Sequence, residues 1–103
     1  GQIGYDFINN DTNPQDDYFH GTAVSGVIAA VRNNNVGIAG VAGSKIKIMA
    51  LKAIDSTGSG GLAPAVNAIN FAVQTYYDNE CANLQLDRKL KSTLTPLDLK
   101  ACQ

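Results

Sequence analysis

Residues 45–54 read KIKIMALKAI, and this stretch decides the fold class. Lys45 and Lys47 alternate with Ile46 and Ile48, and the residues that follow are almost all apolar. A short apolar run of this kind is typical of a strand covered on both faces, as the strands of a parallel sheet are. We therefore expect a parallel strand here.

Helical patterns lie on both sides of this strand. Residues 20–31 (HGTAVSGVIAAV) are small and apolar almost all round, which predicts a helix buried on most sides. In residues 62–77, apolar side chains recur at spacings of three and four behind Pro64, a residue that the first helical turn tolerates. The segments expected to be loops are residues 1–19, 32–43 and 55–61. This alternation of helix, strand and helix predicts an α/β fold.

Length and composition restrict the possible functions. The chain has 103 residues, which suits one domain. Its net charge of -1 provides no basic surface for nucleic acid, and no apolar run reaches the roughly 18 residues of a membrane-spanning helix. We therefore expect no nucleic-acid partner and no membrane span. Because the chain begins at Gly1 and its only methionine is Met49, we also expect a mature segment or a piece of a longer chain.

His20 is the only histidine, and the segment that it opens resembles a known family. Residues 20–43 (HGTAVSGVIAAVRNNNVGIAGVAG) resemble the subtilisin-like serine peptidases, or subtilases. In that family the catalytic histidine opens an H-G-T-H-V-A-G helix, and an Asn-rich loop ending in G-I-A-G-V-A-P follows. Residues 4–15 (GYDFINNDTNPQ) and 47–73 (KIMALKAIDSTGSGGLAPAVNAINFAV) are similar to the flanking segments of thermitase-like members.

The resemblance covers residues 3–74 and implies a partial subtilisin-like fold, with a parallel strand flanked by helices. It divides the chain into a partial peptidase domain at residues 1–77 and a divergent tail of unknown structure at residues 78–103. Two departures, Ala23 in place of a second, non-catalytic histidine and Gly43 in place of proline, suggest a divergent member. Whether Cys81 and Cys102 pair in an oxidising compartment is left open.

Subtilases hydrolyse peptide bonds with an Asp-His-Ser triad, in which the serine attacks the carbonyl carbon and the histidine accepts its proton. The resemblance implies that His20 is this general base. The family's aspartate belongs to an apolar strand followed by D-T-G or D-S-G, and its serine to a G-T-S-x-A-x-P setting. Neither setting occurs in this chain. The residues excluded on this ground are Asp6, Asp11, Asp16, Asp17, Ser25, Ser44, Ser56, Ser59 and Ser92.

With one matched triad residue of three, we expect the chain to be inactive alone. The leading hypothesis is a portion of a secreted subtilisin-like serine endopeptidase that contributes His20 and part of the substrate groove. Its substrates would be peptides or proteins, and its partner the remainder of the peptidase domain. Two alternatives stay open. One is a catalytically dead, calcium-stabilised remnant that binds peptides, and the other is an unstable fragment without function.

Oxygen-bearing side chains follow one another at mostly alternate positions in the first loop: Asp6, Asn9, Asp11, Asn13 and Gln15. Ca²⁺ takes six to eight oxygen ligands of this kind, although Asn and Asp are also common in solvated turns. The resemblance implies a structural Ca²⁺ site here, with Asn13 offering its carbonyl. We expect a reduced affinity because Asn9 replaces an aspartate.

The resemblance implies a second Ca²⁺ site in the loop after residue 30. Its ligands would be the backbone carbonyls of Val31, Val36 and Ile38 and the side chain of Asn34. We expect this site to be incomplete, because the family takes a further carboxylate from a segment upstream of residue 1. An ordinary turn is the alternative.

Small residues follow the predicted strand at Gly58, Ser59 and Gly60. They resemble the family's edge segment that pairs with an extended substrate, where small side chains let another chain approach closely. We therefore expect them to bind substrate, with Ile54 at the wall of a nearby apolar pocket. A flexible linker is the alternative.

Overall fold

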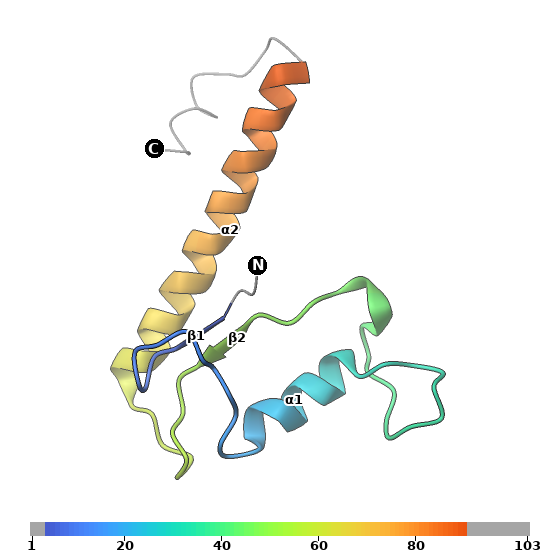
Figure 1. Cartoon of the computed structure of the whole chain (residues 1–103), viewed down its shortest axis with the longest axis vertical. Helices are drawn as coiled ribbons and strands as arrows, with labels where there is room; N and C mark the ends of the chain where they lie inside the picture. Colours follow the sequence, from blue (N-terminus) through green and yellow to red (C-terminus); the bar gives the residue numbers. More distant parts are fainter. Residues whose placement is uncertain (1–3, 91–103) are drawn as a thin grey trace. The chain divides into compact units, whose positions relative to one another are not determined.

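The computed structural model describes residues 4–90, and Figure 1 shows its elements. In chain order these are strand β1 (Gly4–Asp6), helix α1 (His20–Ala29), the 3-10 helix η1 (Gly43–Lys45), strand β2 (Ala50–Lys52) and helix α2 (Leu62–Leu90). The chain divides into two compact units, residues 1–68 and 69–103. Both strands and α1 lie in the first unit. Its parallel sheet and helices form a partial α/β fold, as the sequence predicts.

The two strands form a parallel sheet that pairs Gly4 with Ala50, Tyr5 with Leu51 and Asp6 with Lys52. This pairing confirms the prediction of a parallel strand, but β2 covers only three of the ten residues 45–54. All three residues of β2 are paired with β1. The loop predicted for residues 1–19 is wrong at β1, because so short a strand shows no alternating pattern.

Gly4 allows the two strands to approach. A Cβ atom there would lie 2.9 Å from the carbonyl oxygen of Ala50 and 3.0 Å from Cγ of Pro14. Both separations are shorter than ordinary contacts, so a larger residue would push β1 away from β2. The sheet therefore depends on a glycine that the sequence pattern alone does not single out.

Helix α1 begins at His20 as predicted and ends at Ala29, two residues before the predicted end. The expectation that it is buried on most sides is wrong, since none of its residues is buried. Val27 is 57% exposed and Val24 is 45% exposed. An apolar helix needs cover on several faces, and the described part of the chain provides little of it.

The segment after α1 returns along the end of the helix. Gly40, Val41 and Ala42 donate backbone hydrogen bonds to the carbonyls of Ala30, Val27 and Ile28, at 3.0, 3.0 and 2.9 Å. These bonds satisfy carbonyl groups that a helix end leaves without partners. Gly40 is required here, because a Cβ atom would overlap the backbone of Ala29 and Ala30.

Helix α2 begins at Leu62 as predicted but continues to Leu90, so its predicted end at residue 77 is wrong. Residues 78–90 contain no Gly or Pro and are rich in strong helix formers, which explains the extension. The helix is continuous at residue 77, and the domain division predicted there stays a prediction. The side chains of Cys81 and Cys102 and all of Ser92 lie outside the described residues, so the pairing of the cysteines also stays a prediction.

Little apolar surface is buried. Among the described residues, Ala68 is the only buried hydrophobic one, at 8% exposure, and Asp6 is the buried charged one, at 2%. Within residues 4–90, no helix is both long and apolar enough to cross a membrane.

Candidate active site

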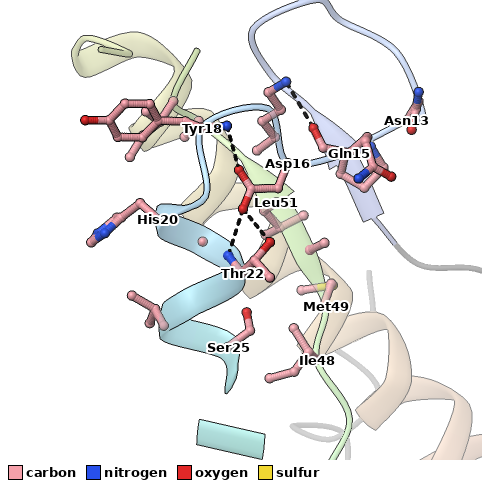
Figure 2. A pocket seen from close by; sticks show the side chains of 17 residues that line it. Asn13, Gln15, Asp16, Tyr18, His20, Thr22, Ser25, Ile48, Met49 and Leu51 are labelled. Carbon is pink, nitrogen blue, oxygen red and sulfur yellow. Dashed lines mark hydrogen bonds between the residues drawn. The ribbon is translucent and has the colours of Figure 1, made fainter. Parts of the chain in front are cut away.

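His20 occupies the first position of α1, and its side chain is exposed. In Figure 2 its imidazole extends outward from the first helical turn. The residue before it, Phe19, caps the helix with a positive φ of 84° and makes no side-chain capping bond. A positive φ is costly for a bulky residue, so other groups must hold this turn.

Asp16 holds the turn. Its Oδ1 atom accepts the backbone N–H groups of Tyr18 and Phe19, both at 2.9 Å. Its Oδ2 atom accepts the backbone N–H of Thr22 at 2.9 Å and also the Thr22 hydroxyl (Figure 2). The first N–H groups of a helix have no partner within the helix, and Asp16 supplies one. The donors lie on both sides of His20.

These bonds also fix the charge of Asp16. The Thr22 hydroxyl, followed by the N–H groups of Tyr18 and Thr22, holds the pKa of this carboxyl far below its ordinary range. Hydrogen bonds to a carboxylate favour its charged form, and the positive end of the helix dipole acts in the same direction. Asp16 is therefore ionised at neutral pH.

A pocket of about 680 Å³ lies beside this turn. Residues of the 13–18 loop, the first half of α1 and residues 48–54 line it (Figure 2). Both His20 and Ile54 belong to its lining, so the structure brings the predicted general base and the predicted pocket wall together. Ser25 lines it as well.

No triad partner reaches His20 within the described part of the chain. Neither a carboxylate nor a hydroxyl group there makes a hydrogen bond to its imidazole. Asp16, the aspartate bonded to this turn, directs its oxygens to backbone N–H groups and to Thr22. The imidazole is thus open to approach from outside these residues.

The predicted substrate edge is a tight turn that starts at Asp55. The N–H of Asp55 donates to the carbonyl of Ser59 at 2.7 Å, and the N–H of Gly58 donates to the carbonyl of Asp55 at 3.0 Å. Oδ1 of Asp55 accepts the Thr57 hydroxyl at 2.6 Å and the N–H groups of Thr57 and Ser59 at 2.9 and 3.1 Å. A hydrogen-bonded turn of this kind is unlike a flexible linker. The substrate-binding role of Gly58, Ser59 and Gly60 stays a prediction.

The edge turn contacts the loop that precedes His20. Gly58 has a φ of +82°, and a Cβ atom there would overlap the ring of Tyr18. At Gly60 a Cβ atom would overlap the carbonyl of Ala53. Glycine is therefore required at both positions for close approach.

The first predicted Ca²⁺ loop is closed by its own backbone. The N–H of Asp6 donates to the carbonyl of Asp11 at 2.8 Å, and the N–H of Asp11 donates back at 3.2 Å. The Asp6 carboxylate accepts the N–H groups of Ile8 and Asn9, at 2.7 and 2.9 Å, and the side-chain amide of Asn9 at 2.9 Å. Asn13 donates its N–H to the carboxylate of Asp11 at 2.8 Å. The structure thus gathers Asp6, Asn9, Asp11 and Asn13 in one closed loop.

Asp6 is charged although it is buried. Burial is the largest single influence and raises its pKa, but the hydrogen bonds from Asn9 and Ile8 and the charge of Lys52 together leave the pKa below its ordinary value. Its oxygens are satisfied by N–H groups, as in an ordinary Asx turn. A 180° rotation of the Asn9 side-chain amide would exchange the positions of its oxygen and nitrogen and so present the oxygen as a ligand.

The second predicted Ca²⁺ loop is exposed. A pocket of about 170 Å³ is lined by Val31 and residues 33–39, a range that includes Asn34, Val36 and Ile38. Oδ1 of Asn34 accepts the N–H of Val36 at 3.1 Å. Among the residues whose side chains the structure describes, no group of three or more His, Cys, Asp or Glu suited to a metal occurs. The first predicted site relies on carboxylate, amide and carbonyl oxygens, and the second on amide and carbonyl oxygens. Both stay predictions.

Lys52 is a residue of this site that sequence reasoning missed. Its side chain is only 9% exposed. Its ammonium group donates to Oδ2 of Asp17 at 2.7 Å and to the carbonyl of Gln15 at 3.1 Å, and it lies 3.7 Å from Oδ2 of Asp6. The hydrogen bond that Lys52 donates to Asp17 is the main cause that raises the pKa of Lys52. A single lysine inside an apolar strand is the signal, because a buried ammonium group needs carboxylate partners.

Comparisons with known proteins agree on one family. The model of the subtilase family matches residues 2–84. Thermitase from Thermoactinomyces vulgaris is 45% identical over 69 residues, which is 67% of this chain and 24% of thermitase. A thermophilic serine proteinase from Bacillus sp. (strain AK1) is 45% identical over 83 residues, or 81% of this chain and 20% of that protein. Subtilisin from Bacillus pumilus is 45% identical over 76 residues, which is 73% of this chain and 27% of that subtilisin.

The matched segments cover 20% to 27% of the length of these three relatives. No solved structure matches the model.

Proposed function

This chain belongs to the subtilase family, and from that premise we propose that it is a portion of a subtilisin-like serine endopeptidase, with His20 as its general base. Peptides or proteins are its substrates. Ile54, Gly58, Ser59 and Gly60 form part of the groove that binds them. The finding that supports this proposal most directly is the position of His20 at the first residue of α1, beside the pocket that Ile54 also lines.

The chemistry needed from His20 is proton transfer. An imidazole can take the proton of a serine hydroxyl as that oxygen attacks the carbonyl carbon, and can return it to the leaving amine. Both steps require a ring that is exposed and held in a constant direction. His20 is exposed, and the Asp16 bonds on either side of it hold the backbone that carries the ring. In this proposal the triad aspartate of the partner then fixes the direction of the ring.

The remaining triad members belong to a partner in this proposal. The aspartates and serines of this chain lack the family's settings, and no described carboxylate or hydroxyl is bonded to the imidazole. We assign the triad aspartate and serine to the remainder of the peptidase domain. The chain alone is accordingly inactive, since loss of one triad member already lowers turnover by several orders of magnitude.

The lack of a described triad partner for His20 favours a second candidate function. A catalytically dead, calcium-stabilised remnant would retain the 55–59 turn and bind peptide segments along Gly58, Ser59 and Gly60 without cleaving them. This candidate needs no triad partner. It differs from the first in predicting that no serine is ever activated near His20.

We further propose that Ca²⁺ binds the first loop, through oxygens of Asp6, Asn9, Asp11, Asn13 and Gln15. The closed Asp6–Asp11 backbone pair supports this site, and the donor set consists of the hard oxygen ligands that Ca²⁺ takes. A second ion at Val31, Asn34, Val36 and Ile38 is proposed on the weaker support of the small pocket there. Bound Ca²⁺ would stabilise the loops. We also propose that the protein is secreted, as the resemblance implies.

A fluorophosphonate probe, which labels activated serines, tests the first function. The protein is isolated from its source in Ca²⁺, treated with the probe, and analysed by mass spectrometry to locate the added mass. We expect the label on a companion chain or segment, on a serine outside residues 1–103. Label on a serine of this chain would contradict the assignment of the nucleophile to the partner. Absence of label would favour the remnant.

The His20→Ala variant supplies the matched test of the general base. In the reassembled enzyme this change should abolish labelling and peptide hydrolysis while the companion chain still binds. Unchanged turnover would refute the role of His20. Thr12→Ala, an exposed change in the same loop region, serves as the control and should leave turnover unaltered.

A further inference from the structure

Lys52 contacts the residues on both sides of Asp16, and we call such a pair of flanking contacts a bracket. Its ammonium group donates to the carbonyl of Gln15 at 3.1 Å and to the carboxylate of Asp17 at 2.7 Å. Gln15 and Asp17 are the two chain neighbours of Asp16. Lys52 therefore fixes the backbone on one side of Asp16 and the side chain on the other.

Asp16 forms a second bracket of the same kind around His20. Its carboxylate binds the N–H groups of Tyr18 and Phe19 before His20 and those of Thr22 after it. The two brackets are nested, since Lys52 flanks Asp16 and Asp16 flanks His20. A displacement of residues 15–17 would move the Asp16 carboxylate away from the start of α1.

We infer that Lys52 is a positioning residue for His20: its ammonium group holds residues 15–17 against β2 and so sets Asp16 where it caps α1 and fixes the backbone from which the imidazole projects. The inference rests on the proposed function, because orientation matters only if His20 acts as a base. Lys52 itself touches no reacting atom and moves no proton.

Burial and charge explain why lysine suits this position. The Lys52 side chain is 9% exposed and is paired in register with Asp6 on β1. An ammonium group with little access to water retains its charge only with close acceptors, and here they come from β1 and from residues 15 and 17.

A purely structural role is the competing explanation. Lys52 also lies 3.7 Å from Asp6 and could simply stabilise the pairing of β1 with β2. Loss of that contact would weaken the whole first unit evenly. Loss of the bracket would instead disturb residues 15–22 first.

Amide hydrogen exchange and two-dimensional NMR on the full chain separate these explanations. The variants are Lys52→Met, Lys52→Arg and the control Lys47→Met, which makes the same change at an exposed lysine of the same segment. In Lys52→Met we expect exchange of the Tyr18 and Thr22 amides to accelerate roughly tenfold, as loss of a charged hydrogen-bond partner implies, with shifted His20 resonances. The Ala30 and Ser59 amides should exchange as in the wild type.

Lys52→Arg should restore most of the wild-type pattern, because a guanidinium group can donate to both acceptors, and Lys47→Met should not change it. If Lys52→Met unfolds the chain, Asp17→Asn removes the ion pair at almost constant volume and is measured at the same amides.

Two results would overturn the inference. One is an unchanged exchange rate at Tyr18 and Thr22 in Lys52→Met. The other is an equal acceleration along the whole first unit, including Ala30 and Ser59. Neither measurement uses hydrolysis, so failure of this inference is distinct from failure of the fluorophosphonate test of the proposed function.

Discussion

The Asp16 carboxylate accepts both the backbone N–H and the hydroxyl of Thr22, which lies six positions further along the chain. This pair closes the turn in which Phe19 has a positive φ and from which α1 starts. His20, the proposed general base, lies between these two anchors. The local order of the candidate active site therefore depends on one carboxylate.

Replacement of Asp16 should loosen the start of α1. Asp16→Ala removes the acceptor of the Tyr18, Phe19 and Thr22 N–H groups, and we expect the exchange of the Thr22 amide to accelerate roughly fivefold, as loss of a helix cap implies. Asp16→Asn should have a smaller effect, because it retains one acceptor oxygen. Asp17→Ala is not a suitable control, since Asp17 pairs with Lys52, so Asp78→Ala is used. Equal exchange in Asp16→Ala and the wild type would contradict the capping role.

Acid should open the 55–59 turn. The Thr57 hydroxyl, followed by the N–H groups of Ser59 and Thr57, holds the pKa of Asp55 below its ordinary value. A carboxyl whose folded pKa is below its unfolded value of about 3.9 stabilises the fold above that pH. This contribution is lost as the pH falls below about 4 and through the folded pKa.

NMR titration of the Thr57 and Ser59 amides measures this transition. In Thr57→Val the midpoint should rise toward the ordinary value, whereas Thr57→Ser keeps the hydroxyl and should titrate like the wild type. Identical midpoints in all three proteins would show that the hydroxyl does not stabilise the charged carboxylate.

Alanine substitutions in the same turn should differ in severity. Gly60→Ala places a Cβ atom against the Ala53 carbonyl, a backbone group that cannot rotate away. We expect the free energy of unfolding to fall by about 1–3 kcal/mol. Gly61→Ala meets no atom within 4 Å and is affected only by its positive φ of 77°, with a cost of about 1–2 kcal/mol. Gly58→Ala should displace the Tyr18 ring, which is free to move because its side chain is partly exposed.

Chemical denaturation gives the free energies of unfolding, and the NMR signals of the Tyr18 ring report its environment. A Gly58→Ala protein with the wild-type Tyr18 environment would contradict the contact between the two loops. Gly60→Ala should remain the most destabilised of the three.

Calcium should raise the melting temperature if the first loop binds it. At about 100 times the dissociation constant, one bound ion stabilises a folded protein by about 2.7 kcal/mol. Asp11→Asn should remove most of this response, because it removes one carboxylate of the proposed site. Asp55→Asn makes the same chemical change in another turn and should retain the response. A melting temperature that Ca²⁺ leaves unmoved would favour the solvated-turn alternative.

The nature and order of the elements could be predicted because they depend on local patterns. The apolar run at 45–54 contains β2, and the spacing of apolar residues locates the start of α2 at Leu62. The extent of each element was less predictable. β2 covers only the three residues that pair with β1, and α2 is long because no Gly or Pro ends it before Leu90.

Burial could not be predicted from pattern alone. The apolar residues of α1 indicate a covered helix, yet Val24 and Val27 are exposed. The apolar pattern of a helix indicates which of its faces need to be covered. Only the tertiary structure decides whether other elements cover them. The converse holds for Asp6, whose type predicts exposure and which is 2% exposed because N–H groups and Lys52 satisfy its carboxylate.

The sequence by itself determined the α/β order of the chain, its resemblance to the subtilases and the identity of His20 as the candidate base, because these depend on residues that are close together in the chain. Only the tertiary structure decided how His20 is held. Lys52 meets Gln15 and Asp17 across 37 and 35 residues. A contact over such a distance arises from the pairing of β1 with β2, which no local pattern contains.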